Sequence, residues 1–295
     1  MAWLQISVEV PGDQAEMISE AFSAIGALSV TVLDAGDEPL LEPAPGETPL
    51  WSDTRIIALF DAAQDAAGLK QQLQSVLDIP VPDLFSEPLV DRDWSNTWRD
   101  TFGTMQFGER LWVCPVGESP QESGAVVVHM DPGMAFGTGT HATTAMCLHW
   151  LGRHPPLDQR VLDYGCGSGI LAIAAHKLGA ADVTAVDIDP QALLATEENA
   201  RRNDCGSAIE VLHPDRLEFQ AVDLLIANIL ANPLIELADD FSRRLMPGGR
   251  IILTGILAEQ AEAVMAVYRE AFDLCEPVHQ EEWVLLEGVR RHTNA

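Results

Sequence analysis

The feature that most constrains this chain is the stretch VLDYGCGSGILAIAA (161–175), in which an apolar strand pattern leads into three alternate glycines and then an apolar helix pattern. A second strand pattern, DVTAVDIDP (182–190), reaches a carboxylate at Asp187, twenty-two residues after Gly165. A strand, a glycine loop, a helix and a distal acid in this order are typical of βαβ units that bind nucleosides, with the acid on the ribose hydroxyls. The pattern therefore predicts an α/β fold with a nucleoside site.

The spacing of the glycines favours one class of nucleoside ligand. Gly165, Gly167 and Gly169 follow G-x-G-x-G, whereas the dinucleotide fingerprint G-x-G-x-x-G requires a glycine where this chain has Ile170. Asp163, two residues before the first glycine, would repel a pyrophosphate at the positive end of the next helix. S-adenosylmethionine has no phosphate and carries two cationic groups, so it can accept this acid nearby. We expect S-adenosylmethionine as the cofactor; the alternative is a glycine-rich turn that binds nothing.

A neutral amide ends the strand pattern VDLLIAN (222–228), at the edge of an open α/β sheet where ligands bind. Asn is disfavoured inside strands, which makes Asn228 a candidate catalytic residue. Its side-chain carbonyl would accept a hydrogen from a nitrogen nucleophile and aim the lone pair at a methyl donor, and such alignment provides much of the acceleration. The alternative is that Asn228 only caps the following turn.

Two further polar residues are candidates. His141 would take a proton from an amine substrate, or it is a hydrogen-bonded structural residue of its loop. Asp215 would accept the adenine amino group, or it is an ordinary loop acid in HPDRLEF. The sequence leaves both pairs of alternatives open.

The charge of the chain limits its partners. The sequence has 45 acidic and 17 basic residues, a formal net charge of −28. Such a field repels phosphate backbones and anionic lipids. It therefore argues against direct binding of nucleic acid or membrane and favours a basic protein or a cationic small molecule, although the excess acid also serves solubility.

The five cysteines show no C-x-x-C spacing, so we expect reduced thiols and no metal site. The start of the chain lacks a basic region followed by a continuous apolar run, and no run of 18 apolar residues occurs. These features predict a cytoplasmic protein, and we expect a monomer.

The order of patterns divides the chain. Residues 1–92 alternate strand and helix patterns as βαββαβ, which predicts a small ferredoxin-like α+β domain. Residues 93–108 contain Trp94 and Trp98 four apart, which predicts a helical linker whose aromatic side chains pack on a domain or form a substrate platform. Residues 109–295 read as a Rossmann-like domain with a seven-stranded, mostly parallel sheet, in which the last strand is antiparallel.

Five segments together resemble one family. They are MDPGMAFGTGTHATT, VLDYGCGSGILAIAAHKLGA, VDIDPQAL, ANILANPL and EEWVLLEG. The chain is similar, over nearly its whole length, to the bacterial methyltransferases of large-subunit ribosomal protein eleven. The glycine loop alone indicates the class I methyltransferase superfamily, whereas FGTGTH before it and NILA after it are more specific.

The resemblance implies an S-adenosylmethionine-dependent protein N-methyltransferase that trimethylates lysine side chains and the N-terminal amine of that ribosomal protein. It implies that the leading domain recognises the substrate and that a flexible linker lets the catalytic domain reach several amines. On the family pattern Thr144, Gly165, Asp187 and Asn228 match cofactor-binding positions, and Asn228 also faces the target amine.

Two other functions remain as alternatives. One keeps the cofactor and changes the acceptor to another translation protein or a small amine. The methyltransferases of glutamine or adenine, which this family resembles at a distance, carry Asn-Pro-Pro-aromatic after the fourth strand. This chain has Asn228-Ile229-Leu230-Ala231 instead, which argues against a flat amide or base stacked on an aromatic ring as the acceptor. The other is a non-catalytic scaffold for ribosome assembly, which would not need three alternate glycines.

Overall fold

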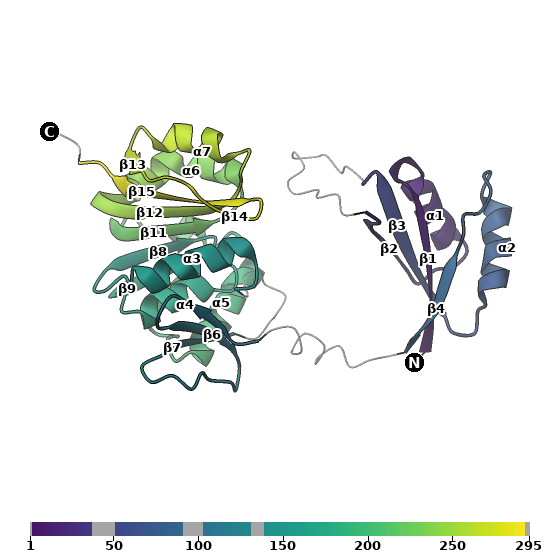
Figure 1. Ribbon diagram of the computed structural model, residues 1–295, viewed down its shortest axis with the longest axis horizontal. Coiled ribbons are helices and arrows are strands. Elements are labelled where there is room, and N and C mark those ends of the chain that lie inside the picture. Colours follow the sequence, from purple (N-terminus) through teal and green to yellow (C-terminus); the bar gives the residue numbers. More distant parts are fainter. Residues whose placement is uncertain (1, 37–50, 91–102, 131–138, 293–295) are drawn as a thin grey trace. The chain divides into compact units, whose positions relative to one another are not determined.

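The computed structural model describes residues 2–36, 51–90, 103–130 and 139–292. The chain forms two compact units, residues 1–94 and 95–295 (Figure 1). Most of the predicted helical linker, together with Trp94 and Trp98, lies outside the described residues. Its last part is not helical, because Met105–Phe107 form strand β5 and pair with the next strand. This part of the prediction was wrong since Met105 and Phe107 pack into the second unit as a strand edge.

The N-terminal unit is one antiparallel sheet with two helices. Its elements are β1 (Ala2–Pro11), the 3-10 helix η1 (Gly12–Gln14), α1 (Ala15–Ala24), β2 (Ser29–Asp34), β3 (Asp53–Asp61), α2 (Ala66–Val76) and β4 (Phe85–Val90). The strand order is β2-β3-β1-β4. Even-numbered residues of β1 and β3, such as Ile6 and Phe60, are buried against Phe22 of α1 and Leu73 of α2. Strand periodicity thus directs alternate side chains to the helices.

The C-terminal unit is built on an eight-stranded sheet. Its elements in chain order are β5 (Met105–Phe107), β6 (Leu111–Pro115), β7 (Val126–Met130), α3 (Ala142–Arg153), β8 (Arg160–Tyr164), α4 (Ile170–Lys177), β9 (Asp182–Val186), α5 (Pro190–Arg202), β10 (Ile209–Leu212), η2 (Pro214–Arg216), β11 (Val222–Asn228), α6 (Ala231–Arg244), β12 (Leu245–Leu257), α7 (Ala261–Tyr268), β13 (Phe272–Leu274), β14 (Val278–Gln280) and β15 (Trp283–Arg290). The strand order of the sheet is β10-β9-β8-β11-β12-β15-β13, and β14 pairs with β15 outside this order.

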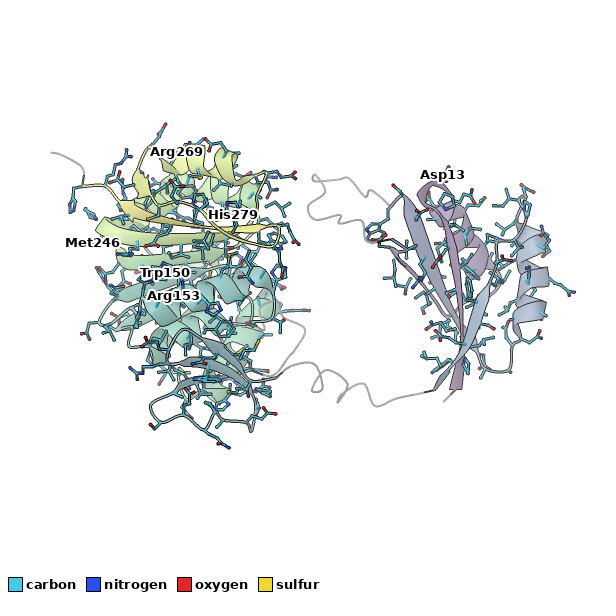
Figure 2. The ribbon with its side chains drawn as sticks, viewed as in Figure 1. Asp13, Trp150, Arg153, Met246, Arg269 and His279 are labelled. Carbon is cyan, nitrogen blue, oxygen red and sulfur yellow. The ribbon has the colours of Figure 1, made fainter. Side chains whose placement is uncertain are left out.

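Five of these strands, β8 to β12, are parallel, and β15 enters antiparallel beside β12. The prediction of seven strands was wrong by one, because the short strand β14 folds back on β15 through a two-residue turn. Figure 2 labels His279 of β14. A three-residue strand is too short to leave a clear alternation in the sequence.

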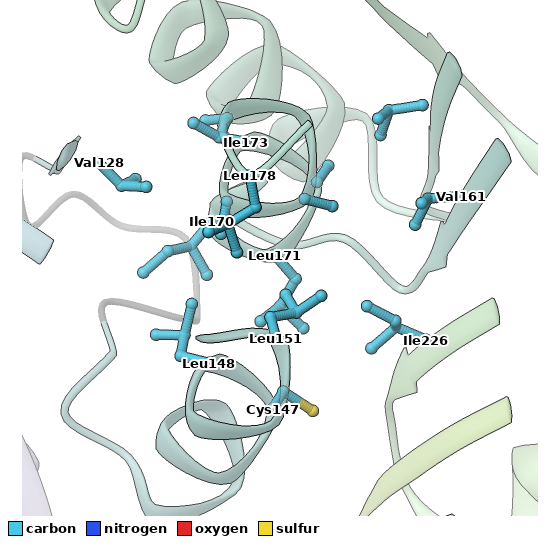
Figure 3. Close-up of a cluster of buried hydrophobic side chains, with 14 of the residues drawn as sticks. Val128, Cys147, Leu148, Leu151, Val161, Ile170, Leu171, Ile173, Leu178 and Ile226 are labelled. Atoms are coloured by element: carbon cyan, nitrogen blue, oxygen red, sulfur yellow. The ribbon is translucent and has the colours of Figure 1, made fainter. Parts of the chain in front are cut away.

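Helices cover both faces of the parallel strands. Side chains of α3 and α4 pack in one core with β8, β11 and β7, as Figure 3 shows for Leu148, Ile173 and Ile226. The opposite core contains Leu234 and Phe241 of α6 and Val264 of α7. Helix α4 is nearly all apolar because it is buried between other elements, as is usual for a helix that is apolar on every side.

A second, smaller sheet has the order β5-β6-β7. Its edge strand β7 is held by one side chain from the end of α5: Asn203 accepts a hydrogen bond from the backbone N–H of His129 (2.8 Å) and donates one to the His129 carbonyl (2.7 Å). The described residues contain no helix long and apolar enough to cross a membrane.

Candidate functional site

The glycine loop between β8 and α4 lies at the centre of the sheet. β8 pairs in parallel with β9 on one side and with β11 on the other. The chain continues from β8 to β9 and β10 and then returns to β11, so strand order reverses at β8. The carboxyl ends of β8, β9 and β11 therefore meet at the position where open α/β sheets bind ligands.

Each alternate glycine adopts a backbone conformation that favours glycine. Gly165, Gly167 and Gly169 have φ angles of 80°, 54° and 78°, a left-handed region in which a Cβ is strained. At Gly169 an added Cβ would lie 2.7 Å from the Cγ2 atom of Thr196, and at Gly165 it would lie 2.2 Å from the Cγ2 atom of Ile229. The G-x-G-x-G spacing is thus explained by the left-handed backbone conformation at all three positions and by a neighbouring side chain that leaves no room for a Cβ at two of them.

The backbone amides of this loop are engaged within the protein. The N–H groups of Gly165 and Cys166 both donate to the Val186 carbonyl, at 2.7 and 3.0 Å, and that of Gly169 donates to Cys166. The Gly167 N–H donates to Oδ2 of Asp187 at 2.9 Å. The loop therefore leaves few bare amides for a pyrophosphate, which would need several of them.

Asp187 follows β9 directly and is half-buried. Its Oδ1 accepts the Asp189 N–H at 2.9 Å, while Oδ2 accepts that of Gly167. Each carboxylate oxygen has a second lone pair, so the fixed carboxylate retains acceptors for a pair of hydroxyl groups.

Two residues of α5 hold the loop from its other side, and the sequence analysis missed both. The Thr196 hydroxyl donates to the Gly167 carbonyl (3.0 Å), and the Asn199 amide donates to the Ser168 carbonyl (2.9 Å). Both are buried. Their spacing of three residues on one helix face is the signal that could have indicated them.

Asp163 lies beneath the loop and is fully buried. Its Oδ2 accepts the Ala172 N–H of α4 at 2.9 Å, whereas its Oδ1 has no hydrogen-bond partner in the described structure. Burial raises the pKa of this carboxyl to about 7, and the nearby Asp187 carboxylate adds to the rise. Burial also raises the pKa of the neighbouring Cys147 and Cys166 thiols, so both remain protonated.

Asn228, the last residue of β11, is joined to α3. Its Nδ2 donates to the Oγ1 atom of Thr144 at 3.2 Å, and Thr144 is buried. The contact spans 84 residues in sequence, and it places two predicted site residues side by side. One of the two N–H donors of the Asn228 amide is thereby engaged.

The structure places His141 at the start of α3. Its Nδ1 lies 2.8 Å from the Thr143 hydroxyl and accepts the Thr143 N–H, so His141 caps the helix, and its ring meets Trp283 edge-to-face with centroids 5.2 Å apart. The helix therefore begins at Ala142, directly after this cap.

Asp215 lies in the short helix η2 after β10, with its side chain 88% exposed and 3.4 Å from His213. Thus Thr144, Asn228, Asp187 and the three glycines come together at one edge of the sheet, with Asp163 below them. Asp215 lies at the outer end of this edge. The described residues show no group of three His, Cys, Asp or Glu side chains suited to a metal ion.

Comparison with known proteins gives a consistent result over the full length. A family model described as "Ribosomal protein L11 methyltransferase (PrmA)" matches residues 2–291. The chain is 54% identical over 291 residues to ribosomal protein L11 methyltransferase of Methylococcus capsulatus, covering 98% of this chain and 99% of the relative. It is 49% identical over 292 residues to that of Nitrosococcus oceani, covering 99% and 100%.

A solved structure is also similar. The crystal structure of ribosomal protein L11 methylase from Lactobacillus delbrueckii subsp. bulgaricus matches with a TM-score of 0.59 and 31% sequence identity. The match covers 65% of this chain and 100% of that one.

Proposed function

Because the chain belongs to the ribosomal protein L11 methyltransferase family, we propose that it transfers methyl groups to lysine side chains and to the N-terminal amine of ribosomal protein L11. It is a methyltransferase that uses S-adenosylmethionine. The observation that carries the amine assignment is the contact between Asn228 and Thr144 beside the glycine loop. Successive transfers to one nitrogen, up to trimethylation, are part of the proposal.

The residues at the sheet edge fit this cofactor. The engaged loop amides suit a ligand without phosphate, and the Asp187 carboxylate suits ribose hydroxyls. The buried Asp163 carboxyl, with one unpartnered oxygen, adds a negative potential beneath the loop when it is ionised. We assign cofactor binding to these residues, to the three glycines and to Thr144. When bound, S-adenosylmethionine supplies a methyl group activated by a sulfonium.

Asn228 orients the acceptor amine in this proposal. A lysine with a pKa of about 10.4 must lose a proton before it attacks, which costs about 4.6 kcal/mol at pH 7. A carboxylate at this position would stabilise the ammonium and raise that cost, whereas a neutral amide holds the amine without doing so. Because Thr144 engages Nδ2, the Asn228 Oδ1 accepts a hydrogen from the amine and fixes the direction of its lone pair.

His141 is a poor match for the base in this arrangement, since its Nδ1 caps α3 and contacts Thr143. We assign it a role in positioning the start of α3, one helical turn before Thr144. Asp215 keeps its proposed role as acceptor for the adenine amino group.

We assign substrate recognition to residues 1–92 and catalysis to residues 109–295. The βαββαβ order and the strand order β2-β3-β1-β4 support a ferredoxin-like module in the first part. The strong negative charge supports a basic protein substrate without direct contacts to nucleic acid or membrane. A monomeric enzyme in the cytoplasm completes the proposal.

The function is tested with purified ribosomal protein L11 as the acceptor. Incubation with S-adenosylmethionine should add mass in steps of one methyl group, and peptide mapping should place them on lysines and the N-terminal amine. Calorimetry should show binding of S-adenosylmethionine and none of NAD. Binding of NAD alone, or methyl groups found only on glutamine, would refute the proposal.

A further inference from the structure

Asp163 places an ionisable group where the fold itself needs only a hydrogen-bond acceptor. It lies in β8 between Ala185 of β9 and Ile226 of β11, and none of its surface is exposed. Its Oδ2 accepts the N–H of Ala172 in the first turn of α4 at 2.9 Å, whereas its Oδ1 has no hydrogen-bond partner among the described residues. An Asn would accept the same hydrogen bond without a charge to desolvate. The carboxyl is therefore explained by something other than folding.

The groups around Asp163 do not neutralise a negative charge. Cys147 of α3 and Cys166 of the glycine loop lie close to it, and burial raises the pKa of both thiols. The Asp187 carboxylate at the end of β9 adds a negative potential. In the part of the chain that the structure describes, no Lys, Arg or His side chain forms a hydrogen bond or ion pair with Asp163. An ionised Asp163 thus receives one backbone N–H and no positive charge from the protein.

The free protein relieves this cost by holding a proton on the carboxyl. Burial raises the pKa of Asp163 to about 7, the N–H of Ala172 opposes the rise, and the Asp187 carboxylate adds to it. Near pH 7 both protonation states are therefore populated. An opposite charge within about 4 to 6 Å lowers the pKa of a carboxyl by about 1 to 3, so one added positive charge is enough to favour the ionised state.

The methyl donor and the product that remains after transfer differ by one such charge. S-adenosylmethionine carries a sulfonium, whereas S-adenosylhomocysteine has a neutral thioether, and both retain the ammonium of the amino acid part. The glycine loop follows Asp163 directly, and Gly165, Gly167 and Gly169 leave only backbone at three of its positions. Because glycine lets a ligand approach the backbone closely, the loop suits a site in which the charge of the ligand reaches the carboxyl beneath.

Successive transfers to one nitrogen, which are part of the proposed function, make this difference important. After each transfer the product must leave and a new donor must bind. The two ligands share their adenosine and amino acid groups, so contacts to those groups, such as that of Asp187 with ribose hydroxyls, bind both alike. The charge on sulfur is the property by which the site can distinguish them.

We propose that Asp163 makes the site selective for the charged donor: it holds a proton at Oδ1 in the free protein, releases it to solvent when S-adenosylmethionine binds, and recovers it from solvent when the sulfonium charge is gone. The ionised carboxylate stabilises the bound donor, and the protonated carboxyl does not stabilise the product. This inference rests on the proposed function, since it takes S-adenosylmethionine as the cofactor, and adds to it the residue that distinguishes donor from product.

Calorimetry in phosphate and in imidazole buffer counts the protons released on binding, because the two buffers differ in their heat of ionisation. At pH 6.5 the wild-type protein should release about half a proton or more for each S-adenosylmethionine bound, provided that the bound charge lowers the pKa of Asp163 by about 1 or more. Asp163→Asn should release at most about a tenth of a proton. The difference between the two proteins removes any titration of the ligand's own amino group.

The affinity for S-adenosylmethionine relative to S-adenosylhomocysteine gives a second readout. Asp163 ionises as the pH rises, and the ionised form favours the donor, so this ratio should rise about fivefold or more from pH 5 to pH 8 in the wild type. It should stay within twofold in Asp163→Asn. The matched control is Asp189→Asn, which removes an exposed carboxylate close to Asp187 and keeps the oxygen that caps α5. This control should retain the wild-type rise.

Infrared difference spectra observe the same proton in the wild type and do not depend on how well the variant folds. Addition of S-adenosylmethionine at pH 6.5 should remove the C=O stretching band of a protonated carboxyl, and addition of S-adenosylhomocysteine should leave that band in place. A band that persists in the presence of S-adenosylmethionine would refute the inference.

The remaining outcomes separate the two proposals. If S-adenosylmethionine binds without releasing a proton, or if both ligands release the same amount, the selectivity of Asp163 is refuted while the function stands. Equal release by wild type and Asp163→Asn assigns the proton to another group and also refutes it. If the wild-type protein does not bind S-adenosylmethionine at all, the proposed function fails, and the inference with it.

Discussion

Replacement of Asp163 by Asn should change how the stability of the catalytic unit depends on pH. Burial raises the pKa of Asp163 from its ordinary value of 3.8 to about 7 in the folded protein. The folded state therefore holds this proton to a higher pH than the unfolded chain does. Stability from this group is fully present below about pH 4 and is lost as the pH rises to about 7.

The size of the loss follows from the two pKa values. Each pKa unit corresponds to about 1.4 kcal/mol, so the ionised carboxyl costs the folded state about 4 kcal/mol above pH 7. About 2 to 3 kcal/mol of this develops between pH 5 and pH 8. An Asn retains the oxygen that accepts the Ala172 N–H and has no charge to desolvate. Any constant cost of its amide nitrogen cancels when the two pH values are compared.

The measurement is guanidinium unfolding of the cofactor-free protein at pH 5 and pH 8, with pulse hydrogen exchange on β8 peptides to select the catalytic unit. The free energy of unfolding of Asp163→Asn relative to wild type should rise by about 2 to 3 kcal/mol from pH 5 to pH 8. Asp239→Asn on the exposed side of α6 is the control and should show no such rise. If the free energies of unfolding of Asp163→Asn and wild type change by the same amount between pH 5 and pH 8, ionisation of Asp163 does not destabilise the folded state and the reasoning is refuted.

Three further predictions concern the site. Gly169→Ala should weaken S-adenosylmethionine binding at least tenfold and lower the melting temperature, because its φ is 78° and the added Cβ would lie 2.7 Å from Thr196; unchanged calorimetric binding would contradict this. Thr144→Val, which loses the acceptor for Asn228, should lower kcat about tenfold, whereas Thr144→Ser should restore most of it; equal rates for the two variants would remove the hydroxyl from the mechanism. Asn228→Asp should keep cofactor affinity in calorimetry and slow methylation of amines, and a wild-type rate would remove Asn228 from the mechanism.

The sequence was sufficient for the parts of the fold that have strong periodicity. The alternation in β1, the buried run of β8 and the glycine spacing all correspond to observed elements. The short strand β14 and the strand β5 at the end of the predicted helical linker were not predictable, since three residues define no period. Their positions depend on pairing with β15 and β6.

The candidate site shows the same division. Residues at strand ends, such as Asp187 and Asn228, were identified because parallel strands bring their carboxyl ends together. The contact of Asn228 with Thr144 and the support of the loop by Thr196 come from helices far away in sequence. The role of Asp163 also required the structure, because only burial beneath the loop shows that its carboxyl is desolvated.

The two hydrogen bonds between the Asn203 side chain and the His129 backbone have a consequence for association between copies of this chain. An outermost strand with free N–H and C=O groups is a template on which another chain can add a strand. The amide of Asn203 offers an acceptor and a donor to the same residue, as a neighbouring strand would, and so occupies one complete pairing position of β7. An Asn203→Ala chain should expose that position and form aggregates more readily on mild heating, which light scattering would detect.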